Sequence, residues 1–241
     1  RRWYGSTVSE GIFRWLYAGL TDMDYAQIRP QTGPESVPAL VDFDLLRLHP
    51  LQHGTMMGWG PANFLSKEET RDLSRSPALI PDPAFYKYVG TSIAYGHMLL
   101  LGYDYIPPLQ LFVRYCALMQ SIQGEYLTDV AAEILYHDGD RFLPTSRALY
   151  NGAYAKGRLR VRYSRGLTVT VNLNPEAPWK IEQAGRTWNL PPYGWVVDKP
   201  GEILSYSALI DGERVDYTST QDALYLGSGA TCRREGALEV E

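Results

Sequence analysis

The chain has 241 residues and a formal net charge of −4, and 45% of its residues are hydrophobic and 21% charged. This composition is typical of a globular protein and excludes a disordered chain. Because acidic residues outnumber basic ones, we expect no broad basic surface and no binding of nucleic acid. We also expect no membrane insertion, since no apolar run approaches the roughly 20 residues of a spanning helix.

The sequence predicts neither a metal site nor a cofactor. Its two cysteines, Cys116 and Cys232, are too few for a disulfide framework, and no Cys/His cluster has metal-ligand spacing. The serine-nucleophile, phosphate-loop and dinucleotide motifs are absent. The first residues, Arg1-Arg2-Trp3-Tyr4, lack an initiating Met and the apolar region of a signal peptide. We therefore expect a longer precursor.

The first fifty residues predict two segments of α/β type. Residues 6–9 have strand character and are followed by Glu10-Gly11 and a helix-compatible stretch over 12–18, which is the order of a βα unit. After a loop rich in Pro and Gly, residues 39–46 predict a second strand. The nearly continuous apolar character of this strand favours a buried parallel sheet.

Two longer helices are predicted in the middle of the chain. Asp82-Pro83 favours a helix start, and apolar residues then recur from Phe85 to Leu100, with Gly102 as the predicted C-cap. A second helix is predicted over residues 109–123, and Gly124 is expected to end it.

From about Gly157 onward the pattern predicts an antiparallel β domain. Residues 159–163 and 167–173 alternate around a turn at Arg165-Gly166, which indicates a β-hairpin. The segment 131–136 fits either a helix or a strand, and Asp211-Gly212 is typical of a hairpin turn. Further strands are predicted at 179–181, 186–190, 194–197, 203–210, 214–217 and 223–226. Many short strands at regular spacing favour a sandwich or barrel.

The predicted fold class is therefore α/β followed by all-β. Two βα-like segments cannot close a parallel sheet, and a (β/α)₈ barrel takes about 250 residues. We expect residues 1–128 to form the C-terminal end of such a barrel with trailing helices, its earlier strands lying upstream. Alternatively, the two strands join another sheet. Residues 129–241 are expected to form an antiparallel β-sandwich.

Several segments of the chain resemble glycoside hydrolases. Residues 159–172, Trp179 and the segment 190–196 (Leu-Pro-Pro-Tyr-Gly-Trp-Val) resemble the C-terminal part of the α-galactosidase-like and endo-α-N-acetylgalactosaminidase-like enzymes. In these enzymes a catalytic barrel is followed by a β-sandwich. The resemblance, which extends from Ser6 to Val197, implies hydrolysis of O-glycosidic bonds by two carboxylates. It marks an architecture and identifies no substrate.

The catalytic candidates implied by this chemistry are Glu10 and Asp44. Catalytic groups of a barrel lie at the carboxyl ends of its strands, and Glu10 follows the first predicted strand, with Gly11 leaving room for a ligand. Equally, Glu10 could be an exposed loop residue. Asp42 and Asp44 share one face of the second strand, where two carboxylates raise each other's pKa or bind a cation. The alternative is that one of them pairs with Arg47.

The substrate-binding candidates are polar or aromatic residues near these carboxylates. His49 and His53 could hydrogen-bond sugar hydroxyls, although such residues more often have a structural role. Trp59, between two glycines, could stack on a sugar ring or pack under the β domain. Asp22 fits a loop or helix cap, as does Asp24, and either could line the rim of the site. Asp42 completes the set.

The leading hypothesis is that the chain is part of a glycoside hydrolase whose partners are a carbohydrate substrate and the upstream part of the same precursor. The alternative is a non-catalytic carbohydrate-binding or structural module attached to an enzyme. A third possibility is an inert scaffold with an interaction surface.

Overall fold

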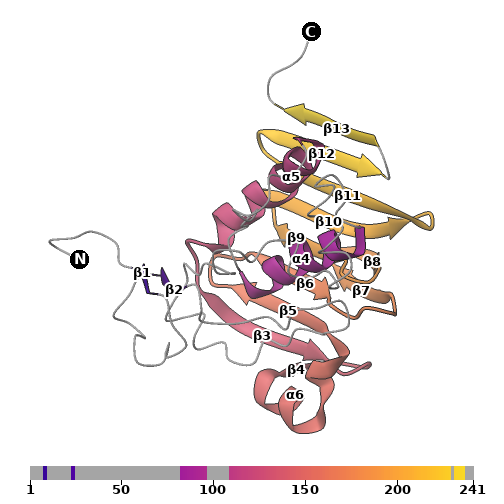
Figure 1. Cartoon of the computed structure of the whole chain (residues 1–241). Coiled ribbons are helices and arrows are strands. Elements are labelled where there is room, and N and C mark those ends of the chain that lie inside the picture. The colour runs from indigo at the N-terminus through magenta and orange to yellow at the C-terminus, as the bar shows by residue number, and fades with distance from the viewer. Residues whose placement is uncertain (1–7, 10–22, 25–81, 97–108, 229–230, 237–241) are drawn as a thin grey trace, which may run out of the picture.

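One antiparallel sheet dominates the protein. The computed structural model describes residues 8–9, 23–24, 82–96, 109–228 and 231–236. Nine strands pair side by side in a single sheet, with every pairing antiparallel (Figure 1). In sheet order they are β13 (Thr231–Gly236), β12 (Ala223–Ser228), β11 (Glu213–Thr220), β10 (Ile203–Ile210), β9 (Trp195–Lys199), β6 (Thr168–Asn172), β5 (Arg158–Tyr163), β3 (Ala131–His137) and β4 (Phe142–Pro144).

Alternation along the strands sorts the side chains between the two faces of the sheet. In β5, Leu159 and Val161 are fully buried on one face, while the intervening arginines point to the other. Val169 and Val171 of β6 join the same buried face. The predicted hairpin over 159–163 and 167–173 is confirmed, and the ambiguous segment 131–136 is a strand.

Two helices cover this face of the sheet. Helix α4 (Asp82–Tyr95) packs against β5 and β6, and α5 (Leu109–Tyr126) packs against β10 and β11. Their buried side chains share one hydrophobic core with the sheet, including Phe85, Val89, Leu118, Ile122 and Trp195. Removing such apolar side chains from water is the main stabilising contribution.

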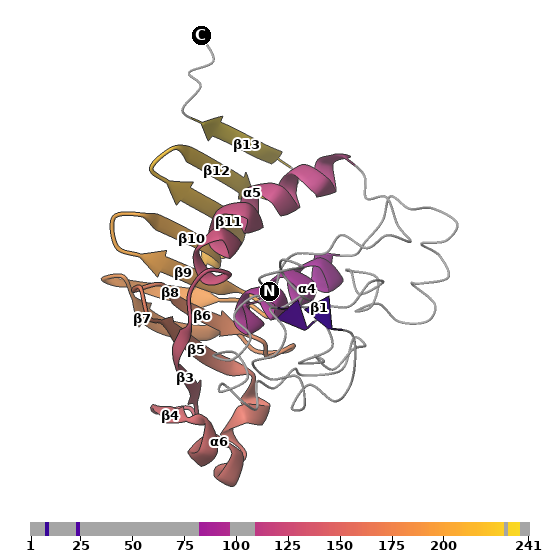
Figure 2. The ribbon, with the colours of Figure 1, turned by 90° about the vertical axis from the view of Figure 1, so that its left-hand side faces the viewer.

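A two-stranded hairpin covers the opposite face. Strands β7 (Trp179–Gln183) and β8 (Arg186–Leu190) pair with each other, and Trp179 and Trp188 pack in a second core with Val196 and Ala208. Figure 2 shows this hairpin on one side of the sheet and α4 and α5 on the other. The described part of the chain is thus mostly antiparallel β. A sandwich of two sheets was predicted, but in the described residues the second sheet consists only of the two strands β7 and β8.

Two tight turns set the pairing of the hairpins. Asp211 and Gly212 join β10 to β11, and Ala184 and Gly185 join β7 to β8. All four residues have positive φ, between 52° and 87°, as a two-residue turn with the twist of antiparallel strands requires. The predicted turn at Asp211-Gly212 is confirmed.

Both predicted helices are present, but each ends at a different residue from the one predicted. Helix α4 ends at Tyr95 and not near Gly102, because Gly96 adopts a φ of 66° that leaves the helical region. Helix α5 passes through Gly124 and continues to Tyr126. Tyr126 is 1% exposed and stacks on Tyr163, with 6.1 Å between ring centroids. Burying this ring offsets the roughly 1 kcal/mol that a glycine costs within a helix.

After residue 128, four shorter elements were not anticipated: the edge strand β4, helix α6 (Thr145–Asn151), the 3₁₀ turn η2 (Ala153–Lys156) and the edge strand β13. Within the described ranges, no helix is long and apolar enough to cross a lipid bilayer.

Two short strands are described near the N-terminus. Strand β1 (Val8–Ser9) pairs in parallel with β2 (Met23–Asp24). The predicted strand at 6–9 agrees with β1, and parallel pairing fits the expected βα order. The expectation that Asp24 lies in a loop or cap is wrong, because it belongs to β2. The predicted strand over 39–46 lies outside the described residues, and two short strands do not establish a barrel.

Asn172 joins β6 to the segment after β8. Its side-chain amide donates to the carbonyl oxygens of Ala177 (2.9 Å), Leu190 (3.0 Å) and Pro191 (3.0 Å). Asn172 is fully buried, so water does not readily take the place of its amide, although the carbonyl of Pro191 also accepts from the backbone N–H of Gly194 (2.8 Å).

We expect Asn172→Ala to lower the free energy of unfolding by about 2–3 kcal/mol, because it removes a buried amide that donates to three carbonyl oxygens. Chemical denaturation followed by circular dichroism measures this change. Asn189→Ala is the matched control, since the Asn189 side chain makes no hydrogen bond to the described residues, and should cost less than about 1 kcal/mol. Equal losses in the two variants would contradict the role of Asn172.

Asp129 holds the turn between β5 and β6. Its carboxylate accepts hydrogen bonds from the backbone N–H groups of Val130 (2.7 Å) and Arg165 (2.8 Å) and from the hydroxyl of Ser164. Burial by itself would raise the pKa of Asp129, but these hydrogen bonds and the charge of Arg165 outweigh it and lower the pKa.

A lowered pKa in the folded state makes this carboxylate a pH-dependent source of stability. The stabilisation is complete above the unfolded pKa of about 3.9 and is lost as the pH falls through the folded value. We expect Asp129→Asn to be less stable than the wild type near pH 7 and the difference to shrink below about pH 4. Thermal unfolding across pH measures it. A stability difference between Asp129→Asn and the wild type that stays constant with pH would show that the Asp129 carboxylate is not the source. Glu133→Gln, at a carboxylate that is 45% exposed, is the control.

Candidate functional site

None of the predicted site residues lies in the part of the chain that the structure describes. The structure therefore neither brings these side chains together nor separates them. They are Glu10, Asp22, Asp42, Asp44, His49, His53 and Trp59. Among the described residues, two polar arrangements stand out: a buried charged cluster under the helices and a cavity on the opposite face of the sheet.

The buried cluster gathers around the carboxylate of Asp216 on β11. We call it the Asp216 cluster, and it consists of Tyr86, Arg114, Ser207, Arg214 and Asp216. The carboxylate, whose side chain is 4% exposed, accepts hydrogen bonds from Tyr86 Oη (3.0 Å), Arg114 Nη2 (3.0 Å) and Ser207 Oγ (2.6 Å). Arg114 also donates to the hydroxyl of Tyr86. One carboxylate thus binds α4, α5 and β10.

Arg214 extends the cluster to the segment before β9. It donates to Ser207 Oγ (2.8 Å) and to the carbonyls of Pro192 (3.1 Å) and Tyr193 (3.3 Å). Its guanidinium lies 3.1 Å from the centroid of the Tyr86 ring, a cation–π arrangement. Burial and the nearby charge of Asp216 raise the pKa of Tyr86 far above its usual value. The phenol therefore stays protonated as a hydrogen-bond donor, which suits a structural role.

The cavity lies at the tip of the β7–β8 hairpin. This hairpin-tip cavity has a volume of about 510 Å³ and is lined by Ala184, residues 198–204 and residues 219–221. Three separate segments therefore build it: the β7–β8 turn, the connection from β9 to β10, and the end of β11. Its polar groups include the carboxylates of Asp198 and Glu202, the hydroxyl of Ser219 and the amide of Gln221.

Gln183 holds Asp198 in place at the cavity wall. The amide nitrogen of Gln183 donates to Asp198 Oδ1 and to the carbonyl of Thr168 (3.2 Å), and its amide oxygen accepts from Thr170 (2.5 Å). Gln183 is only 9% exposed. Because the amide of Gln183 is itself held by Thr168 and Thr170 of β6, the carboxylate of Asp198 has a defined position at the cavity wall.

A row of aromatic rings continues from the cavity along the same sheet face. Tyr206 and Tyr217 stack with centroids 4.9 Å apart and an interplanar angle of 16°, and Trp188 lies 4.8 Å from Tyr206. Leu204 and Ser219, which line the cavity, pair directly across β10 and β11, as do Tyr206 and Tyr217 two positions further along. Alternate residues share a face, so the rings adjoin the cavity.

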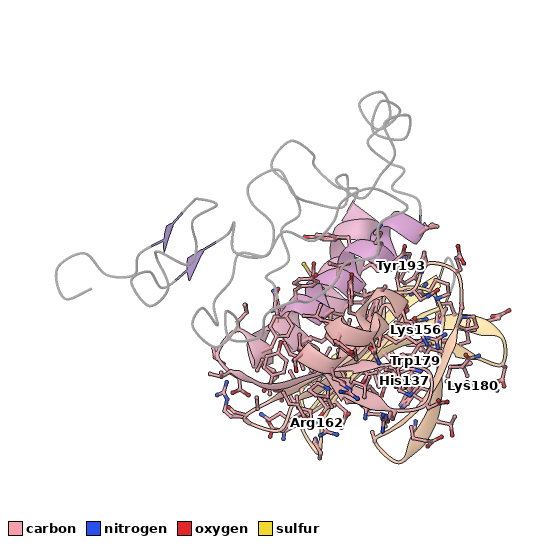
Figure 3. All side chains as sticks on the ribbon, turned by 90° about the horizontal axis from the view of Figure 1, so that it is seen from below. His137, Lys156, Arg162, Trp179, Lys180 and Tyr193 are labelled. Carbon is pink, nitrogen blue, oxygen red and sulfur yellow. The ribbon has the colours of Figure 1, made fainter. Side chains whose placement is uncertain are left out.

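A second aromatic group lies near the β3–β4 turn. The ring centroids of His137 and Trp179 are 5.2 Å apart (Figure 3), and Phe142 lies 5.0 Å from His137. Burial lowers the pKa of His137, so the imidazole is neutral near pH 7. The group packs the hairpin against the sheet and has no nucleophile or paired carboxylate. In the described ranges, no set of three His, Cys, Asp or Glu residues could hold a metal ion.

Sequence reasoning overlooked both polar arrangements. The residues of the cavity lie on three segments and have no common motif. The Tyr206–Tyr217 pair did carry a signal, because a two-residue turn at Asp211-Gly212 places these positions opposite each other.

We expect Asp216→Ala to lower the free energy of unfolding by about 3–5 kcal/mol, because it leaves the guanidinium of Arg114 without its buried counter-charge and removes the acceptor of Tyr86 and Ser207. Urea denaturation measures this loss. Glu133→Ala is the control, since it removes an ion pair to Arg162 in which both side chains are about half exposed, and it should cost at most about 1 kcal/mol. Similar losses in both variants would show that the Asp216 cluster does not hold the helices on the sheet.

The described residues thus form an antiparallel β domain with two helices built into its core. A buried structural cluster lies on the helix face of the sheet, and a cavity with adjoining aromatic rings lies on the other face. No protein-family model, curated protein or solved structure matches this chain. The resemblance to glycoside hydrolases expected from residues 159–172 and 190–196 therefore stays a prediction.

Proposed function

We propose that the chain is the C-terminal part of a glycoside hydrolase that cleaves O-glycosidic bonds with Glu10 and Asp44 as its catalytic carboxylates. In this proposal the β domain supports the segment that precedes it. The observation that carries the proposal is the position of the segment 190–196, which bears the resemblance and also joins the β domain to the helices before it.

Three contacts of the segment 190–196 favour a role of the β domain in holding the preceding helix in place. Arg214 binds the carbonyls of Pro192 and Tyr193 and reaches Tyr86 of α4. Gly90 of α4 lies so close to the carbonyl of Tyr193 that a Cβ there would be 3.0 Å from its oxygen. These contacts join the β strands to α4, which precedes them in the chain. Such direct packing differs from a binding module on a flexible linker, and in the proposal it favours the hydrolase over the alternative of a separable module.

The N-terminal strands add a second line of support. Glu10 directly follows β1 in the sequence, and β1 pairs in parallel with β2. Catalytic groups of barrel enzymes follow the carboxyl ends of parallel strands. In the proposed reaction one carboxyl group protonates the leaving oxygen, and the other attacks the sugar or activates water. These steps require no cofactor.

The test is hydrolysis of chromogenic glycosides, including α-galactosides and α-N-acetylgalactosaminides, by the full-length gene product. We expect Glu10→Gln and Asp44→Asn each to lower kcat by about 10²–10⁴-fold, as the loss of an acid, base or nucleophile does. The matched controls are Glu133→Gln and Asp222→Asn, which change carboxylates outside the proposed catalytic pair and should leave kcat unchanged.

Two results would contradict this proposal. Full activity in both Glu10→Gln and Asp44→Asn would show that the carboxylates are wrongly assigned. No turnover of any glycoside by the full-length protein would favour a non-catalytic module.

A further inference from the structure

We propose that the hairpin-tip cavity and the adjoining Tyr206–Tyr217 pair bind a neutral carbohydrate chain. This inference rests on the proposed function in one respect, that the protein acts on carbohydrate. It adds a second site, in the β domain, where substrate would be held without being cleaved.

The size of the cavity suits a small ligand. Its volume of about 510 Å³ falls within the range of roughly 300–1,000 Å³ that is usual for small-molecule sites. Apolar surface from Leu204, Ile203 and Ala184 lies beside the polar groups. A sugar ring has the same division, with C–H groups on its faces and hydroxyls around its edge.

Asp198 supplies the main hydrogen-bonding group. One of its oxygens accepts from Gln183, and the other makes no hydrogen bond to the described residues. The hydroxyl of Ser219 likewise makes none in the described ranges. Asp198 and Ser219 flank Leu204 on either side across the sheet, so a sugar lying over Leu204 could meet the carboxylate at one end and the hydroxyl at the other, and sugar hydroxyls both donate and accept.

The charges in the cavity disfavour an anionic ligand. Lys199 is the cation of the lining, and its ammonium group already binds Glu125 (2.9 Å) and Glu202. Hydrogen bonds to these two carboxylates, Glu202 foremost, raise the pKa of Lys199, so the ammonium stays charged and engaged. Asp198 forms no ion pair within the described residues, although it interacts electrostatically with Arg160, and its carboxylate adds to that of Glu202 in repelling carboxylates and phosphates.

The tyrosine pair extends the site beyond one sugar. Tyr206 and Tyr217 are both half-buried, so part of each ring remains accessible beside the cavity. Aromatic rings bury large apolar area with little loss of side-chain freedom, and the tyrosine hydroxyl adds a polar contact. A ligand of two or more sugars could therefore place one unit in the cavity and the next against Tyr217.

The test is a titration of the complete 241-residue chain, followed by NMR, with melibiose, lactose and cellobiose as neutral probes and glucuronic acid as an anionic probe. We expect saturable binding of at least one neutral disaccharide, with a Kd of about 0.1–5 mM, and weaker binding of glucuronic acid. Asp198→Asn should weaken binding about tenfold, because Asn keeps an oxygen for Gln183 but loses the charge. Tyr217→Ala should weaken the binding of disaccharides more than the binding of the matching monosaccharides.

Asp211→Asn is the matched control. It makes the same substitution at the opposite end of the β10–β11 hairpin, where Asn tolerates the positive φ of 52°, and should leave binding unchanged. The proposal is overturned if no neutral sugar binds up to about 20 mM, if glucuronic acid binds more tightly, or if Asp198→Asn behaves like Asp211→Asn. Absent binding with intact hydrolysis would refute this site alone, whereas absent hydrolysis with intact binding would refute the proposed function alone.

Discussion

The side chain of Asp216 ties together segments that lie far apart in the chain. It is buried between the helices and the sheet, and it binds a tyrosine of α4, an arginine of α5 and a serine of β10. A buried carboxylate is costly unless charged donors surround it. Because those donors come from different elements, the carboxylate is satisfied only when both helices are docked. Formation of the sheet and docking of the helices are thereby coupled.

The same constraint explains the position of the segment 190–196. Arg214 is the second cation of the cluster, and its remaining donors bind the carbonyls of Pro192 and Tyr193. Tyr193 has a positive φ of 59°, an uncommon conformation for a bulky residue that surrounding contacts must stabilise. Gly194 follows, and a Cβ at this position would lie 2.6 Å from the carbonyl oxygen of Ser207. The packing around the segment Pro-Pro-Tyr-Gly thus requires a positive φ at Tyr193 and a residue without a side chain at position 194.

Local patterns in the sequence were enough to predict the β domain. Alternation identified β5 and β6, and Asp211-Gly212 identified a turn whose register follows from its length. Long-range packing was harder. Nothing near Gly124 indicates that the ring of Tyr126, two residues later, will be buried against Tyr163. Alternation likewise could not show that the face carrying Asp216 and Ser207 would be the one covered by helices. The cavity depends on the pairing of three segments, so no single stretch predicts it, and Glu10 and Asp44 stay predictions.

The two edges of the sheet differ in their capacity to accept another strand. One edge is β4, which has three residues, ends at Pro144 and leads directly into α6. Proline has no N–H to donate, and a short edge strand offers few pairing groups, so this side is closed to further growth. The other edge is β13, which has six residues and pairs with β12 along its whole length. A strand added from this or another chain would therefore extend the sheet at β13, next to the strands covered by α5 and remote from α6.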